Sequence, residues 1–264
     1  MSTPFKETDT ALEVVGLTVH FGGLVAVSEV DFTVREGEVT SLIGPNGAGK
    51  TTAFNVITGF LRATAGRVRY RGVSLDGLRP NEVADLGVVR TFQKTSLFNG
   101  LTVYDNLLIG LHRRGRGRVW EILLNLPRIQ ADERELWKHA TVILEQVGLS
   151  HRGSELASDL PYGEQRLLEV AIALAARPTL LLLDEPVSGM NPSETREFME
   201  IVSAIRDQGT TIFLVEHDMR MVMGISDRVI VLNQGVILAE GTPEEIRHHP
   251  EVIRAYLGEG GVHA

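Results

Sequence analysis

Alternating apolar and polar positions predict several β-strands in the first third of the chain. Between residues 12 and 43 the β-rich runs LEVVGLTVH, VAVSEVDFTV and VTSLI are separated by turns, one of them at 35–38. Short strands are also expected around 67–73 and 87–92. The N-terminal part of the chain is therefore predicted to be rich in β-structure.

Two later runs are apolar at nearly every position instead of alternating. TLLLL (179–183) and TIFLV (211–215) are typical of strands that are buried on both faces of a parallel sheet. RVIVLNQGVILAEG (228–241) then predicts a hairpin. The C-terminal part of the chain therefore has the pattern of an α/β protein.

Residues 100–176 are predicted to be mostly helical. Thr102 and Asp105 form a capping-box-like start for VYDNLLIGL, and Gly148 ends a second helix. Apolar residues recur there at helical spacing: Leu136, Ala140, Ile143, Leu144 and Val147, and later Leu167, Val170, Ala171 and Leu174.

Three more helices are predicted from their end signals. One covers about 50–58, with Gly59 as its stop. Asn191 caps another, which Gly209 closes. Its core-facing residues are Phe198, Ile201, Val202 and Ile205. Thr-Pro-Glu-Glu at 242–245 caps a final helix.

Composition excludes some classes of protein. The 264 residues include no cysteine, which excludes disulfides and thiolate chemistry and fits a reducing compartment. The formal net charge of −8 disfavours a general nucleic-acid binder, because phosphate contacts need clustered Lys and Arg. No signal peptide and no bilayer-spanning apolar run is visible, so we expect a soluble chain that reaches a membrane only through a partner.

A basic stretch, HRRGRGR (112–118), stands out against this acidic balance. We favour a solvated loop between helices. The alternative is a surface that lies near anionic lipid headgroups or a partner protein.

The most specific motif is GPNGAGKT (44–51), which matches G-x-x-x-x-G-K-[ST] at every fixed position. A predicted strand precedes it and a predicted helix follows. Its glycines let backbone N–H groups surround phosphate oxygens, and the helix N-terminus adds partial positive charge. Lys50 would reach the β- and γ-phosphates, and the Thr51 hydroxyl would bind Mg²⁺. We expect the nucleotide to be held by Gly44, Pro45, Asn46, Gly47, Ala48, Gly49, Lys50, Thr51 and Thr52.

Polar residues follow both continuous apolar strands. Asp184 and Glu185 end the first, and ligands in open α/β sheets bind beyond the carboxyl ends of strands. Asp184 is placed to hold Mg²⁺ through water, and Glu185 to accept a proton from an attacking water. Glu216 and His217 end the second strand, at the same predicted edge, where His217 would contact the γ-phosphate. Each pair is a weak signal alone and a strong one beside the phosphate loop.

These motifs in this order resemble the ATP-binding cassette of transporters, from about residue 11 to the C-terminus. The resemblance implies an ATPase that uses Mg²⁺. It also implies an α/β fold: a P-loop NTPase (RecA-like) core with an N-terminal antiparallel β-subdomain and an inserted α-helical subdomain. The single domain, 1–264, would divide into the core with its β-subdomain (12–92 and 166–241), the helical subdomain (93–165) and a C-terminal helical segment (242–264).

The resemblance also implies roles that spacing alone does not. Phe21 matches the aromatic on which adenine stacks, with a core aromatic on a strand as the alternative. Gln93 matches the glutamine that joins Mg²⁺ to the membrane-subunit contact. Glu185 matches the catalytic glutamate and His217 the switch histidine, both acting with Lys50. The loop that crosses to the second cassette matches Ser188, Gly189 and Asn191, and Asn191 stands where an aspartate is usual.

LPYGEQR (160–166) lies where the family has its signature, usually Leu-Ser-Gly-Gly-Gln, which contacts the γ-phosphate bound by the opposite cassette. The residues with this implied role are Pro161, Tyr162, Gly163, Glu164 and Gln165. Pro161 replaces the signature serine, so one hydrogen bond to phosphate, worth about 1.5–3 kcal/mol, is missing. The two ATP sites of a dimer would then be unequal, with the site of this chain's Lys50 loop the stronger.

The P-Y-G signature, the opening FGGLVAV, the length of the helical insert and the ending PEVIRAYLGE resemble the ATP-binding subunits of branched-chain amino acid uptake systems. That subgroup implies an importer at the cytoplasmic face of the cell (inner) membrane. The implied partners are a second cassette, of different or identical sequence, two transmembrane permease subunits and, indirectly, a periplasmic or extracellular substrate-binding protein.

Other functions remain open at this point. A urea, amide or lipid transporter is the nearest alternative. A soluble cassette ATPase acting on ribosomes or DNA usually has tandem cassettes or a long coiled-coil insertion, and this sequence has neither. A nucleotide-gated scaffold that does not hydrolyse ATP is disfavoured by Glu185 and His217.

Overall fold

The computed structural model of the protein describes residues 9–91, 97–112 and 127–257. An antiparallel sheet forms near the N-terminus, in the strand order β2-β1-β4-β5. Its strands are β1 (Thr10–Phe21), β2 (Leu24–Arg35), β4 (Ala65–Tyr70) and β5 (Val73–Ser74). Because apolar residues recur at about every second position, one face of β1 and β2 is buried.

The second sheet has the order β10-β9-β3-β8-β7-β6. Its strands are β3 (Val39–Ile43), β6 (Val88–Arg90), β7 (Leu180–Asp184), β8 (Thr211–Val215), β9 (Arg228–Asn233) and β10 (Val236–Gly241). All its pairings are parallel except β9 with β10. Strands β3, β7 and β8 are buried along their whole length, so the prediction of doubly buried strands is confirmed.

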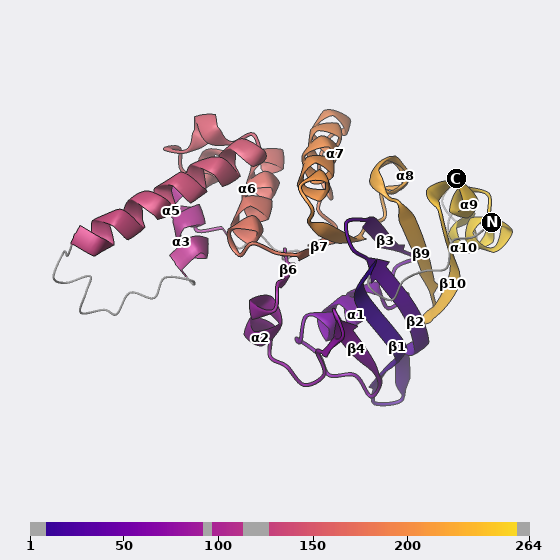
Figure 1. Ribbon diagram of the computed structural model, residues 1–264. Helices are drawn as coiled ribbons and strands as arrows, with labels where there is room; N and C mark the ends of the chain where they lie inside the picture. The colour runs from indigo at the N-terminus through magenta and orange to yellow at the C-terminus, as the bar shows by residue number, and fades with distance from the viewer. Residues whose placement is uncertain (1–8, 92–96, 113–126, 258–264) are drawn as a thin grey trace.

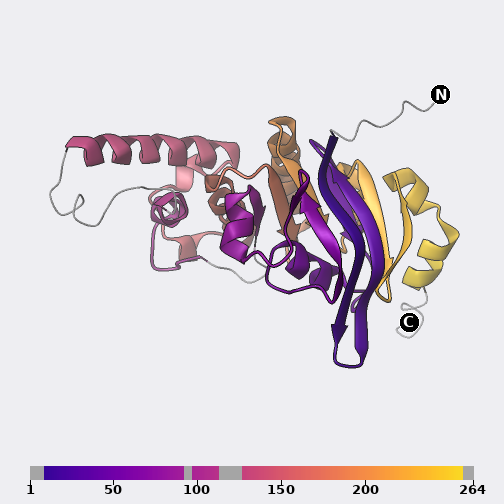
Figure 2. The ribbon, with the colours of Figure 1, turned by 60° about the horizontal axis from the view of Figure 1, so that its bottom comes forward.

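The helices gather in separate groups around this sheet. Figures 1 and 2 show α3, α5 and α6 at one end of the molecule and α9 and α10 at the other. The bounds are α1 (Lys50–Ile57), α2 (Pro80–Asp85), α3 (Val103–His112), α5 (Pro127–Gln146), α6 (Tyr162–Ala175), α7 (Pro192–Asp207), α8 (Met219–Ile225), α9 (Pro243–Arg247) and α10 (Pro250–Leu257). Short 3₁₀ turns lie at Ser150–Arg152 and Ala157–Asp159.

Two large hydrophobic clusters hold these layers together. In one, Phe213 of β8 lies between Phe54 of α1 and Phe32 of β2, with ring centroids 4.9 and 5.5 Å apart. The other joins buried residues of α3, α5 and α6, such as Leu107, to β7 and α7. The helical group is therefore packed on the sheet through a continuous apolar core, not through loops alone.

Several sequence predictions need correction. The expected strand at 67–73 is interrupted, because Arg71 and Gly72 have φ angles of 47° and 77° and turn the chain between β4 and β5. The single final helix is in fact two, since Pro250 begins α10 after α9 has ended. Helix α2 was not anticipated. Within the described residues, no helix has both the length and the apolar character needed to cross a bilayer.

The division into a core, a helical subdomain at 93–165 and a C-terminal segment stays a prediction. So does any role for the basic stretch 112–118, because residues 113–118 lie outside the described part of the chain.

Candidate nucleotide-binding site

The loop at 44–51 connects the end of β3 to the start of α1. Gly44 has φ 151°, and a Cβ placed there would lie 2.0 Å from the carbonyl oxygen of Leu232. Gly49 has φ 105°, and its Cβ would lie 2.5 Å from the Ala26 oxygen. Only glycine fits at these two positions. Gly47 also has a positive φ of 79° but faces open space, so this part of the loop can approach a ligand closely.

Lys50 begins α1 and lies beneath the loop. Its Nζ donates hydrogen bonds to the carbonyl oxygens of Gly44, at 2.6 Å, and Pro45, at 2.9 Å. The side chain is largely buried, so its charged ammonium group is held in place against the phosphate loop. Asn46 and Thr51 are exposed, Thr52 is partly buried and Ala48 is buried. The first N–H groups of a helix have no intrahelical partner, which makes this end of α1 suited to an anion.

Sheet register brings the other predicted residues to the same edge. Leu42 and Asp184 both pair with Val215, from opposite sides of β8. Strands β3, β7 and β8 therefore end at one level, and the residues that follow them, including Gly44, Glu185 and Glu216, lie at one edge of the sheet. This is the edge at which open α/β sheets bind ligands.

Asp184 is buried and makes an ion pair that the sequence did not reveal. Arg90, on β6, donates from Nη2 to Asp184 Oδ2 at 2.5 Å and from Nη1 to Asn55 Oδ1 of α1 at 2.7 Å. The other oxygen of the carboxylate, Oδ1, is buried without a hydrogen-bond partner among the described residues. The only sequence signal for this role was an arginine on a short strand, since a buried arginine needs an anionic partner.

Glu185 and His217 lie beyond the ends of β7 and β8. Glu185 adopts a left-handed backbone with φ 47°, which is unusual for a non-glycine residue, and its N–H donates to Val215 O at 2.8 Å. The side chain of His217 is 58% exposed. Both residues therefore stand at the predicted edge, and His217 faces solvent.

Phe21, at the end of β1, is 50% exposed. Its ring is thus available to a ligand and is not buried in the core. Gln93 lies outside the described residues, three positions after Arg90.

The signature stretch forms the N-terminus of α6. Pro161 is the N-cap residue and makes no side-chain capping bond. Tyr162 is 41% exposed, and its hydroxyl accepts hydrogen bonds from Arg166 Nε and Nη2 at 3.0 and 2.7 Å. Gln165 donates from Nε2 to Leu160 O at 3.0 Å. Gly163 faces Glu194 of α7, which would lie 3.1 Å from a Cβ there.

Glu164 of this stretch is tied to Arg152, 2.9 Å away. Hydrogen bonds to Glu164 and Glu155 raise the pKa of Arg152 above its ordinary value. The three signature side chains that carry polar groups, those of Tyr162, Glu164 and Gln165, are therefore all bonded to residues of their own chain.

The loop before α7 lies next to the signature. A Cβ on Gly189 would be 3.2 Å from the ring of Tyr162. Asn191 caps α7, accepting from the N–H groups of Ser193 and Glu194 at 2.8 and 3.1 Å, as the sequence predicted. Asn191 thus has a structural role that an aspartate would also fill. Ser188 is partly buried.

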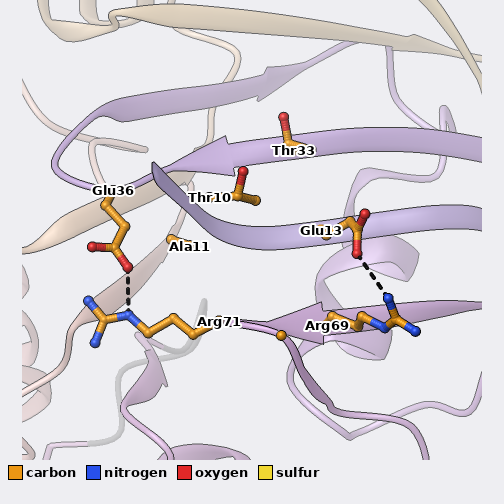
Figure 3. Close-up of a pocket in the computed structure, with 8 residues that line it drawn as sticks. Thr10, Ala11, Glu13, Thr33, Glu36, Arg69 and Arg71 are labelled. Carbon is orange, nitrogen blue, oxygen red and sulfur yellow. Dashed lines mark hydrogen bonds and ion pairs between the residues drawn. The ribbon is translucent and has the colours of Figure 1, made fainter. Parts of the chain in front are cut away.

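A separate hollow of about 720 Å³ lies on the antiparallel sheet, at the end of β1 opposite Phe21. Figure 3 shows that its arginines, Arg69 and Arg71, face Glu13 and Glu36 across the strands. Because these charges are paired, the hollow has no net attraction for an anion. It is not part of the candidate site.

A sequence profile described as "ABC transporter" matches residues 27–188, which include the phosphate loop, the signature stretch and Glu185. The chain belongs to the ABC transporter family. A second profile, described as "Branched-chain amino acid ATP-binding cassette transporter", matches residues 236–262. The resemblance found in the sequence is confirmed.

Curated relatives match nearly the whole chain. The high-affinity branched-chain amino acid transport ATP-binding protein LivG of Salmonella typhimurium is 49% identical over 249 residues, 94% of this chain and 98% of its own. LivG of Escherichia coli K12 is 48% identical and BraF of Pseudomonas aeruginosa 47% identical, with the same coverage.

Solved structures agree with the fold. An ATP-binding cassette of an ABC transporter in its ADP conformation has a TM-score of 0.83 and 32% identity, over 94% of this chain and 99% of that chain. A nucleotide-free cassette has a TM-score of 0.82 and 33% identity, over 94% and 98%. The predicted ABC ATPase fold is confirmed, and the cassette is an ATP-binding ATPase of this family.

Proposed function

We propose that this cassette hydrolyses ATP to power the import of branched-chain amino acids. The observation that carries the proposal is the 49% identity with LivG, which extends over 94% of the cassette. The match of residues 236–262 to the branched-chain amino acid type also supports it and favours it over a urea, amide or lipid transporter.

The chemistry follows from the edge of the sheet. The loop at 44–51 and the buried ammonium of Lys50 would hold the β- and γ-phosphates by charge-assisted hydrogen bonds. Phe21 would stack on adenine. Glu185 would orient the attacking water and accept its proton, an effect typically worth about 10²–10⁴ in rate. His217 would contact the γ-phosphate. Most of the catalysis is then positioning and charge neutralisation.

The residues present fit a magnesium ion. The buried Oδ1 of Asp184 has no hydrogen-bond partner in the described structure, and carboxylate oxygen is a ligand that Mg²⁺ prefers. Thr51, exposed at the start of α1, would supply a hydroxyl, and Gln93 is the third expected ligand. When bound beside ATP, the ion neutralises phosphate charge. Within the described residues, no group of three or more His, Asp or Glu side chains is arranged to hold a metal ion, so water and phosphate would have to provide most of its ligands.

The proposed assembly contains a second cassette, two transmembrane permease subunits and an external substrate-binding protein. Pro161, Tyr162, Gly163, Glu164 and Gln165 would face the ATP of the second cassette, and the loop at 187–191 would cross to it. The cassette would lie peripherally at the cytoplasmic face of the membrane. Closure on ATP and reopening after hydrolysis would do the work, because ATP binds the closed state more tightly.

The test is the pair of variants Glu185→Gln and Lys50→Ala in the complex that co-purifies with the full-length chain. We expect phosphate release and uptake of radiolabelled leucine, isoleucine and valine by the wild type. Glu185→Gln should bind ATP without turnover, and Lys50→Ala should bind ATP about 10–150-fold more weakly. Turnover of Glu185→Gln at the wild-type rate would remove Glu185 from the mechanism. If the complex hydrolyses ATP but takes up no branched-chain amino acid, the proposed cargo is wrong.

A further inference from the structure

Glu216 is a fully buried carboxylate at the end of β8, with 0% of its surface exposed. Burying a carboxylate costs several kcal/mol unless hydrogen bonds or a cation compensate. Among the ion pairs of the described residues, Glu216 has only His217 as a neighbour, with Nδ1 at 3.7 Å. That distance is too long for a hydrogen bond. The compensation must come from elsewhere.

Backbone N–H groups supply it, and they come from two loops. Glu216 Oε1 accepts from the N–H of Val187 at 3.1 Å. Oε2 accepts from the N–H groups of His217 at 2.8 Å and Asp218 at 3.0 Å. The two oxygens of one carboxylate therefore bind the loop that follows β7 and the loop that follows β8.

These loops carry two of the residues proposed to act in catalysis, Glu185 and His217. Val187 is two positions after Glu185, and His217 follows Glu216 directly. Glu185 has φ 47°, a left-handed conformation that persists only where the surroundings enforce it. Its loop is held by the bonds Ser188 N to Glu185 O, at 3.3 Å, and Met190 N to Val187 O, at 3.0 Å. The bond from Val187 to Glu216 anchors this loop to β8.

We propose that Glu216 is a positioning residue that clamps the Glu185 loop to the His217 loop and so sets the distance between base and γ-phosphate contact. The inference rests on the proposed function, since that function gives Glu185 and His217 their catalytic roles. It assigns no contact between Glu216 and substrate. It explains why a charge is buried at a strand end where an apolar residue would cost less. Loss of the clamp lowers turnover and leaves nucleotide affinity in place, because the buried carboxylate of Glu216 bonds to the backbone of these two loops and not to the phosphate loop.

Glu216→Gln tests the hydrogen bonds of the clamp without changing the volume of the side chain. The amide has the same shape but only one oxygen, so its NH₂ group must face either Val187 N–H or the two N–H groups of the His217 loop. In both orientations the side-chain NH₂ group faces a backbone N–H group, so the hydrogen bonds to one of the two loops are lost. A misplacement of about 1 Å can cost about 100-fold in rate, so we expect kcat to fall about 10–100-fold with KM and ATP affinity within about twofold of wild type.

Two further variants keep the test decisive. Glu216→Asp retains the charge but is one methylene shorter, so it can hold its own loop and not Val187. We expect it to lose turnover as well. Glu245→Gln makes the same carboxylate-to-amide change in the capping box of α9, where Gln is equally suitable, and should leave kcat unchanged. Wild-type kcat in Glu216→Asp would mean that only the charge matters and would overturn the clamp.

Hydrogen exchange of the segment 186–190, measured by mass spectrometry on the full-length chain, tests whether the clamp holds this loop and does not depend on an activity assay. Faster exchange there in Glu216→Gln, with unchanged exchange in β3 and α1, supports the proposal. Unchanged exchange at 186–190, or wild-type kcat in Glu216→Gln, overturns it. If instead the wild type releases no phosphate while segment 186–190 responds as expected, the proposed function fails and the structural clamp stands.

Discussion

The N-termini of α1 and α6 are both expected to face phosphate, yet they are built in different ways. At α1 the chain makes the site from backbone: glycines at 44 and 49 fit against carbonyl oxygens of Leu232 and Ala26, and Lys50 bonds to the loop's own oxygens. At α6 side chains hold the turn. Tyr162 is fixed by Arg166 and Glu164 by Arg152. The glycine of this stretch, Gly163, lies against a side chain of α7.

The difference teaches where substitution is tolerated. At Gly44 and Gly49 the backbone site admits no side chain, because an added Cβ would meet main-chain carbonyl oxygens. A site held by side chains can exchange one partner for another, and this sequence has done so at Pro161 and Tyr162. The predictions below test this contrast, from the largest expected effect to the smallest.

Among the changes at the N-terminus of α1, Gly44→Ala should lower the stability of the protein most. Its Cβ would stand 2.0 Å from Leu232 O. Overpacking and the positive φ together should lower the free energy of unfolding by about 3 kcal/mol, or Tm by roughly 6–12 °C. Gly47→Ala is the matched control, since its Cβ would meet nothing within 4 Å. Thermal unfolding followed by circular dichroism decides, and equal losses of Tm in the two variants would contradict the steric account.

Lys50→Ala should remove binding more than stability. The ammonium makes charge-assisted hydrogen bonds, each worth about 1.5–3 kcal/mol, so ATP affinity should fall about 10–150-fold. Titration with a fluorescent ATP analogue in the presence of magnesium measures it. If affinity stays within twofold of wild type, the loop does not depend on this charge.

Tyr162→Phe should produce a moderate effect on the α6 side. It removes the hydroxyl that accepts two hydrogen bonds from Arg166, which also forms an ion pair with Glu169. Burial lowers the pKa of Arg166, but the bonds to Glu169 and Tyr162 outweigh it and raise the pKa overall. We expect unfolding to become easier by about 1 kcal/mol, with Tm lower by about 2–4 °C. ATP affinity of the isolated chain should not change, and a tenfold loss would show that the two helix ends are coupled within one chain.

Pro161→Ser should have the smallest effect on the free energy of unfolding, and it should stabilise the protein where the other variants destabilise it. Serine can accept a hydrogen bond from the first turn of α6, which proline cannot, so stability should rise by about 0.5–1 kcal/mol. Serine also restores the donor that the family usually offers to phosphate. In the complex of two cassettes, the steady-state ATPase rate should therefore rise, and an unchanged rate would remove support for unequal ATP sites.

Much of the fold and part of the site could be predicted because their signals are local. Apolar periodicity marked β7, β8 and α7, and the capping residues Asn191 and Gly209 marked the ends of α7. The strand break at Arg71 was missed, since a turn with positive φ at an arginine has no strong local signal. Helix α2 is short and lies between turns, so its sequence has too few residues to show a helical periodicity.

The sequence by itself determined the phosphate loop, the strands that flank it and the family of the protein, because glycine positions and apolar periodicity act on the backbone within a few residues. Only the tertiary structure decided which charges meet. Arg90 reaches Asp184 across 94 positions, and Glu216 reaches Val187 across 29. The physical reason is that sheet register brings these strand ends together, and register depends on the packing of the whole sheet rather than on the residues beside each charge.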